Sequence, residues 1–191
     1  MRIYIVECDE EKHKYLKLCF GDLENVTLIC DDICNFLKNE KVECVVSPAN
    51  AFGLMDGGYD LALTKWYGEH LQERVQKYIL EHYYGEQPVG TSFIIDAGKD
   101  EQKFIHTPTM RLPQVIKEEK IIYQCMRTTL MLAIENNIES IAIPMFGGTA
   151  GAVSPLKIAR MMREAYDQIN DIPSEINWDY ATKRMFKYLE S

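Results

Sequence analysis

The sequence predicts a three-layer α/β/α fold with a mixed, largely parallel central sheet. Short apolar runs bounded by turn residues alternate along the chain with stretches whose apolar residues recur at helical spacing. Strands that alternate with helices are typical of folds in which helices cover both faces of a mainly parallel sheet. The 191 residues, 47% of them apolar and 26% charged, suit one globular unit, so we expect residues 1–191 to form a single domain of ordinary composition.

Six apolar runs predict the strands. They are residues 2–7, 26–30, 44–46, 91–96, 103–107 and 140–145. The first run alternates apolar and polar residues around Ile3 and Ile5, which is the pattern of a half-buried strand. The fourth and fifth runs flank Gly98-Lys99-Asp100, a sequence that favours a turn between two strands.

Helical spacing and capping residues predict the helices. They are residues 33–37, 60–84 (as one or two helices), 118–137, 156–169 and 174–189, with a short surface element at 12–20. Asp31 or Asp32 is placed to cap the first of these helices. Ser154 and Pro155 are suited to the N-cap and the first position of the helix that follows them.

Two glycine-containing loops, residues 47–60 and 146–153, each follow a strand and lead into a helix. Ligands of open α/β sheets bind at the carboxyl ends of strands, and helix N-termini bind anions through free N–H groups. Neither loop has the lysine of a Walker A motif or the spacing of a dinucleotide fingerprint. This pattern favours a diphosphate held by backbone amides; the alternative is that the glycines only mark tight turns.

Composition excludes several classes of function. The formal net charge of −8 argues against non-specific nucleic-acid binding, although backbone amides can still bind a small anion. No apolar run is long enough for a membrane span. The six cysteines lack zinc-finger spacing, so we expect reduced thiols, no metal, no cofactor and a cytoplasmic location. The oligomeric state stays open.

Five motifs follow one another along the chain: Asp32-Ile33, Val46-Ser47-Pro48-Ala49-Asn50, Asp56-Gly57-Gly58, Ile105-His106-Thr107-Pro108 and the loop 147–152. In this order they resemble the macro domains, a family that binds ADP-ribose and its derivatives. The motif-bearing core spans about residues 26–169 and leaves the C-terminal helix, about 174–189, outside. The nearest subgroup is the bacterial and phage macro-like proteins with SPANxFGxMDGG and PTMRxP motifs, matched here by residues 47–58 and 108–113.

The resemblance implies a role for each matched residue. Asp32 would accept from the adenine amino group, Ile33 would lie beside the ring, and Asn50 would bind the distal ribose. Asp60, ten residues after Asn50, matches the aspartate that orients or activates water in macro hydrolases. Its alternative role is that of a carboxylate favoured by a helix N-terminus. The remaining implied ligand-binding residues are Asp56, Gly57, Gly58, Gly147, Gly148, Thr149, Ala150 and Gly151.

The implied partner is ADP-ribose or an ADP-ribosylated macromolecule, and two functions remain open for it. One is hydrolysis of ADP-ribose from a modified substrate, with Asp60 and Asn50 as catalytic residues. The other is a non-catalytic reader of ADP-ribose or a nucleotide; a vestigial pocket is a third possibility. Ala150 and Ala152 stand where many macro domains place an aromatic residue over the distal ribose, which favours the reader.

Several other residues have simpler roles. Trp178 and Tyr180 are candidates for stacking on adenine, although ordinary packing is the favoured interpretation. His106 is expected to be a core histidine, and Arg111 to pin its proline-bracketed loop or reach a phosphate.

Overall fold

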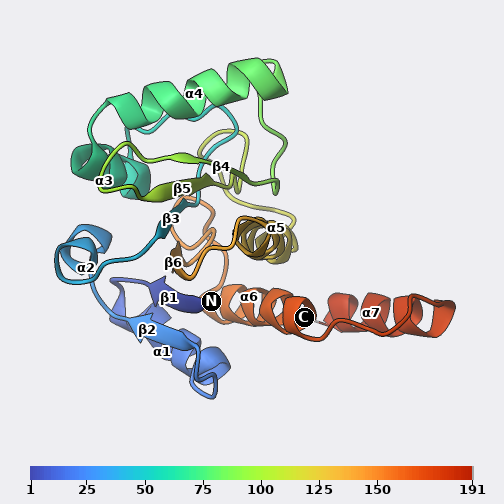
Figure 1. Ribbon diagram of the computed structural model, residues 1–191. Helices are drawn as coiled ribbons and strands as arrows, with labels where there is room; N and C mark the ends of the chain where they lie inside the picture. Colours follow the sequence, from blue (N-terminus) through green and yellow to red (C-terminus); the bar gives the residue numbers. More distant parts are fainter. Residues whose placement is uncertain (191) are drawn as a thin grey trace.

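The computed structural model describes residues 1–190, with side chains through residue 185, and places a six-stranded sheet between two layers of helices (Figure 1). The strands are β1 (Arg2–Val6), β2 (Val26–Ile29), β3 (Cys44–Ser47), β4 (Phe93–Asp96), β5 (Lys103–His106) and β6 (Ser140–Pro144). The helices are α1 (Glu10–Phe20), α2 (Ile33–Asn39), α3 (Gly58–Tyr67), α4 (His70–Tyr83), α5 (Ile121–Glu135), α6 (Pro155–Asn170) and α7 (Trp178–Glu190).

The sheet has the strand order β2-β1-β6-β3-β5-β4. All neighbouring strands are parallel except β4, which pairs antiparallel with β5. That exception follows from the short connection between the two strands, because only antiparallel neighbours can be joined by a tight turn. The predicted three-layer α/β/α fold with a mixed, largely parallel sheet is confirmed.

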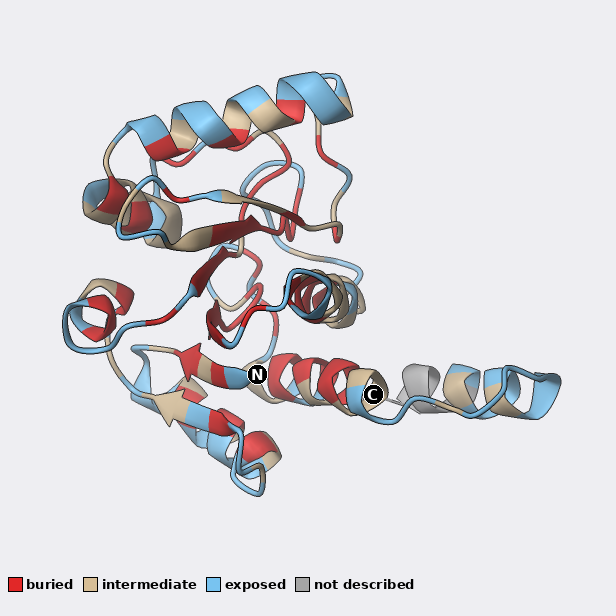
Figure 2. Cartoon of the chain, viewed as in Figure 1, coloured by how far each residue is buried: buried red, intermediate tan, exposed pale blue. Residues whose placement is uncertain are grey.

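The two faces of the sheet each carry a hydrophobic cluster. In β6, Ile141 and Ile143 pack with residues of α1, α5 and α6, whereas Ala142 packs with residues of α2, α3 and α4. Every residue of β6 is buried, as expected for a central strand covered on both faces. Figure 2 shows the buried residues concentrated in the sheet and on the inward sides of the helices. The hydrophobic clusters on both faces of the sheet therefore fix the positions of β3 and β6, and with them the carboxyl ends of these strands.

The region predicted as one or two helices over residues 60–84 forms two, α3 and α4. Gly68 separates them with a φ of +97°, a left-handed conformation that favours glycine. The first helix begins at Gly58, two residues earlier than the apolar pattern indicated, because the preceding glycines give no helical periodicity to read. The start of α3 thus coincides with the end of the first glycine loop.

The predicted caps are only partly realised. Asp32 caps α2, accepting from the N–H groups of Cys34 at 2.8 Å and Asn35 at 3.3 Å. Ser154 occupies the N-cap position of α6 and Pro155 the first turn, as predicted, but the serine side chain makes no capping hydrogen bond.

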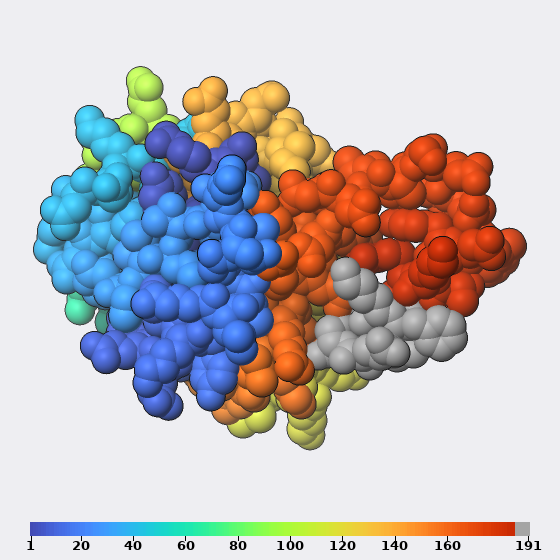
Figure 3. Space-filling view, turned by 90° about the horizontal axis from the view of Figure 1, so that it is seen from below, coloured from blue at the N-terminus to red at the C-terminus, as the bar shows by residue number. Residues whose placement is uncertain are grey.

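Helix α7 lies at the edge of the molecule on the side of α6, away from the sheet (Figures 1 and 3). Arg184 ties it to the body through Glu164 at 3.9 Å, while Trp178 at its start is 88% exposed. Among the residues described, no helix has both the length and the hydropathy required to cross a membrane.

Candidate functional site

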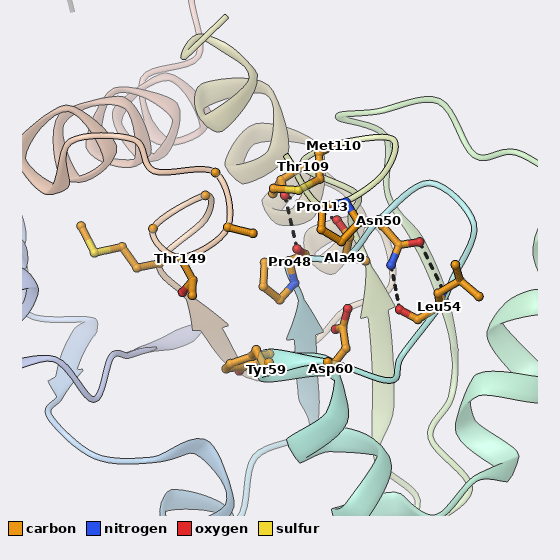
Figure 4. Close-up of a pocket in the computed structure, with 17 residues that line it drawn as sticks. Pro48, Ala49, Asn50, Leu54, Tyr59, Asp60, Thr109, Met110, Pro113 and Thr149 are labelled. Atoms are coloured by element: carbon orange, nitrogen blue, oxygen red, sulfur yellow. Dashed lines mark hydrogen bonds between the residues drawn. The ribbon is translucent and has the colours of Figure 1, made fainter. Parts of the chain in front are cut away.

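A cavity of about 450 Å³ opens at the carboxyl ends of β3, β5 and β6 (Figure 4). Its volume is within the range of small-molecule sites. Its walls are three loops, which follow these three strands. The lining residues are Pro48, Ala49, Asn50, Leu54, Gly57, Gly58, Tyr59, Asp60, Thr109, Met110, Pro113, Met145, Gly147, Gly148, Thr149, Ala150 and Gly151. Both predicted glycine loops therefore contribute to one cavity.

The loop after β5 is fixed against the loop after β3. The N–H group of Ala51 donates to the carbonyl groups of Met110 at 3.0 Å and Arg111 at 3.1 Å. The Arg111 guanidinium makes two hydrogen bonds to Glu86, at 2.5 and 2.8 Å, on the exposed side of the loop. Of the two roles expected for Arg111, the structure shows the one that pins its loop, through the carboxylate of Glu86.

The Asn50 side chain lines the cavity and also holds the turn that follows it. Its Oδ1 atom accepts from the N–H groups of Phe52 at 3.1 Å and Leu54 at 3.2 Å, and its Nδ2 atom donates to the Leu54 carbonyl at 2.7 Å. Figure 4 shows these contacts turning the amide toward Leu54. One N–H bond of the amide remains for a ligand, because an amide nitrogen carries two hydrogens.

The start of α3 presents free N–H groups at the cavity wall. No side chain caps this helix, so the N–H groups of its first turn have no side-chain acceptor. Gly57, the N-cap residue, has a φ of −143°, and a Cβ added there would meet nothing within 4 Å. The protein itself does not require glycine at this position. Open space beside uncapped N–H groups suits the close approach of an anionic ligand.

In the second loop, residues 147–151, carbonyl groups rather than N–H groups take part in the backbone hydrogen bonds among the described residues. The carbonyl groups of Gly147, Thr149 and Gly151 accept hydrogen bonds from the backbone, at 3.3, 3.1 and 2.9 Å respectively. Among the described residues, no hydrogen bond occupies the N–H groups of residues 147–151. A Cβ on Gly151 would lie 2.6 Å from the Gly147 carbonyl oxygen, so here glycine is required by the turn itself.

Asp60 is the charged residue of the cavity wall. Its carboxylate extends from the first turn of α3 toward the Pro48–Ala49 segment (Figure 4) and accepts a short hydrogen bond from the Ser47 hydroxyl. Burial raises the pKa of Asp60 to about 6, against the lowering effect of the Ser47 hydrogen bond and with a further raising effect of Asp56. A fixed carboxylate with a pKa near neutrality has the properties of a general base.

Most of the residues predicted for the site meet at this cavity. Those on its wall are Asn50, Gly57, Gly58, Asp60, Gly147, Gly148, Thr149, Ala150 and Gly151. Asp56 is exposed in the same loop but outside the wall. Asp32 and Ile33 also lie outside it, since Asp32 caps α2 and Ile33, 3% exposed, packs in the core beneath α3. Only the Oδ1 atom of Asp32 serves the cap.

Tyr59 is the aromatic lining residue, and the sequence analysis did not single it out. Its ring packs against the hydrophobic cluster of α2, α3 and α4, and its hydroxyl is buried without a hydrogen-bond partner among the described residues. Burial raises the pKa of this hydroxyl well above its usual value, with smaller contributions from neighbours that include Asp60 and Asp32. The available signal was its place between a glycine pair and Asp60 at a helix start.

His106 lies away from this wall. The side chain is fully buried, its Nδ1 atom is 2.6 Å from the Gln87 Oε1 atom, and its ring stacks on Phe93. Burial lowers the pKa of His106 to about 3, so the ring is neutral at physiological pH. The expectation of a core histidine is confirmed.

The chain is similar to known macro domains in sequence and in structure. Residues 46–162 match the family model described as Macro domain. A relative from Aquifex aeolicus (strain VF5), described as an uncharacterized protein, is 34% identical over 124 residues, which are 64% of this chain and 71% of the relative.

Two solved structures illustrate the structural similarity. The Oceanobacillus iheyensis macrodomain with ADP superposes with a TM-score of 0.62 at 21% identity, covering 83% of this chain and 88% of that one. The Trypanosoma brucei macrodomain in complex with ADP-ribose gives a TM-score of 0.56 at 19% identity, covering 66% and 53%. At such identities these matches establish the fold.

Proposed function

The chain belongs to the macro domain family, and from this premise and the geometry of its cavity we propose that it binds ADP-ribose or an ADP-ribosyl derivative. The observation that carries the proposal is a pair of segments that line one cavity, Gly57–Asp60 and residues 147–151, whose N–H groups have no side-chain acceptor and no hydrogen-bond acceptor, respectively, among the described residues. A diphosphate between them would receive backbone hydrogen bonds and the favourable end of the α3 dipole. The solved macro domains with ADP and with ADP-ribose support this choice of ligand.

The proposed arrangement does not depend on a cationic side chain. The lining residues include neither lysine nor arginine, so the charge of the diphosphate would be balanced by oriented N–H dipoles. Asn50, with its one remaining N–H bond, and Asp60 would then lie at the distal ribose, and Asp32 with its second carboxylate oxygen at the adenine. These placements follow the family resemblance and are part of the proposal.

Titration with ADP-ribose by calorimetry tests the binding proposal, with Gly57→Val as the informative variant. Because the space beside Gly57 is open, the valine should leave the thermal unfolding temperature almost unchanged while it blocks the diphosphate, and ADP-ribose affinity should fall at least about tenfold. Ala181→Val, on the exposed surface of α7, is the matched control. Wild-type protein at 100 times Kd should gain about 2.7 kcal/mol of stability from the ligand. Absence of that gain would reject the proposal.

We further propose that the protein hydrolyses the bond between the distal ribose and a modified acceptor. Asp60 would accept a proton from water as the water oxygen bonds to the anomeric carbon, and the electron pair of the broken bond would leave with the acceptor atom, which takes up a proton from solvent. This role is supported by the Asp60 carboxylate, which the Ser47 hydroxyl holds in place by a hydrogen bond and whose pKa is about 6.

The competing candidate is a reader that binds without hydrolysis. It is favoured by Ala150, which leaves the second loop without an aromatic ring over the distal ribose. A panel of ADP-ribosylated protein, nucleic acid and small-molecule substrates separates the two functions. Turnover that Asp60→Ala abolishes while ADP-ribose binding persists supports hydrolysis. Turnover that survives Asp60→Ala removes Asp60 from the mechanism, and binding with no turnover of any substrate establishes the reader.

A further inference from the structure

The cavity wall has a single aromatic side chain, that of Tyr59. The other large side chains on the wall are aliphatic or sulfur-containing, such as Leu54, Met110 and Met145. The two aromatic residues of α7 that the sequence offered for stacking do not line the cavity, and Trp178 is 88% exposed on a helix at the edge of the molecule (Figures 1 and 3). Among the described residues, a base bound in this cavity would therefore meet one ring.

The Tyr59 ring is held in place by the protein. It packs against the core cluster that contains Ile33 and Phe36, and its hydroxyl oxygen is inaccessible to solvent. The residue as a whole is only half-buried, and it is one of the residues that line the cavity. In Figure 4 the ring lies at the floor of the cavity, between Asp60 and Thr149. A fixed ring binds a flat ligand at little cost in side-chain entropy.

The surroundings of the ring match a base that carries an amino group. Asp32 caps α2, whose residues Ile33 and Phe36 belong to the hydrophobic cluster that Tyr59 packs against, and the Oδ2 atom of Asp32 is not used by that cap. A carboxylate oxygen is an acceptor, and an exocyclic amino group is a matching donor. Tyr59 itself belongs to the first turn of α3, whose N–H groups have no side-chain acceptor and could bind the adjoining phosphate.

We propose that the ring of Tyr59 is the stacking surface for the base of the bound nucleotide and determines its preference for ligands that carry an aromatic base. This inference rests on the proposed function, because it assigns the base subsite of the same cavity. One turn of α3 then contacts three parts of the ligand: its N–H groups hold the diphosphate, Tyr59 holds the base, and Asp60 faces the distal ribose.

The test compares two ligands that differ in the base alone, AMP and ribose 5-phosphate, as competitors for ADP-ribose binding. Tyr59→Leu keeps an apolar side chain against the core but removes the ring. Its AMP affinity should fall about 5- to 100-fold, the range of base–aromatic stacking, while its ribose 5-phosphate affinity should change less than about twofold. Tyr59→Phe keeps the ring and should restore the base-dependent affinity. Trp178→Leu makes the corresponding change away from the cavity.

Each outcome decides a separate point. Wild-type protein that fails to bind ADP-ribose overturns the proposed function and this inference together. Wild-type binding with unchanged AMP affinity in Tyr59→Leu overturns the inference alone, as does an equal loss for AMP and ribose 5-phosphate, which would indicate general damage to the cavity. A selective loss of AMP that Tyr59→Phe repairs and Trp178→Leu does not reproduce supports it.

Discussion

Replacing Asp60 by asparagine should stabilise the protein at neutral pH, by an amount that depends on pH. The Asp60 carboxyl is desolvated at the cavity wall, and burial raises its pKa from 3.8 to about 6 despite the hydrogen bond from Ser47. Asparagine has nearly the same shape and can still accept from Ser47, but it carries no charge to desolvate. The variant therefore removes the electrostatic cost and leaves the packing in place.

The magnitude follows from the difference in proton binding. A pKa difference of about 2 units between the folded and unfolded chain corresponds to about 3 kcal/mol. Since the folded-state pKa is raised, the contribution of Asp60 to stability is fully present below pH 3.8 and is lost as the pH rises through about 6. Because asparagine does not titrate, the stability of Asp60→Asn relative to wild type should grow by about 2.4 kcal/mol from pH 4 to pH 7, and the effect of the Ser47 hydrogen bond is already contained in the pKa of about 6.

Urea unfolding of both proteins at several pH values between 4 and 8 measures this difference. Using the difference between the two proteins cancels the titration of all other groups. Asp56→Asn makes the same chemical change at an exposed position of the neighbouring loop and is the matched control. A difference between wild type and Asp60→Asn that stays flat from pH 4 to 7 would refute the reasoning. So would an equal slope in Asp56→Asn, which would point to net charge rather than burial.

Three further predictions concern other parts of the fold. Asn50→Ala should lower the free energy of unfolding by about 1–3 kcal/mol in urea titration, because it removes three hydrogen bonds that hold the adjoining turn; an unchanged value would contradict that role. Because burial lowers the pKa of His106 from 6.5 to about 3, folding favours the neutral ring. The free energy of unfolding of the wild type, measured with urea, should therefore fall by about 2–3 kcal/mol between pH 6.5 and 4.5, and His106→Gln should not show this fall. The fully buried thiols of Cys44 and Cys125, whose pKa values burial raises, should react with a thiol reagent only at the rate of unfolding; mass spectrometry that finds them labelled in native protein would refute this.

The sequence predicted the order of strands and helices because that order depends on local signals. Apolar periodicity, capping residues and turn residues act within a few residues of where they stand. The same local signals located both glycine loops at strand ends, and a parallel sheet brings such ends to one edge. The direction of β4 also follows from a local feature, the short connection to β5.

The site was predictable as a set of loops but not as a set of contacts. The hydrogen bond between Ser47 and Asp60 joins residues 13 positions apart, and it forms only because α3 packs above the end of β3. In the turn after Asn50, three hydrogen bonds occupy the Asn50 side-chain amide, and the residue type alone does not predict them. Ile33 matches a family motif, yet the packing of α2 places its side chain in the core.

By itself, the sequence determined the fold class, the family resemblance and the two loops that line the cavity, because each depends on residue type and spacing along the chain. Only the tertiary structure decided which groups are free to meet a ligand. The packing of helices on the sheet buries Asp60 enough to raise its pKa and sets the ring of Tyr59 on the wall. Burial and orientation are properties of the assembled layers, and for that reason the chemistry of this cavity emerges at that level.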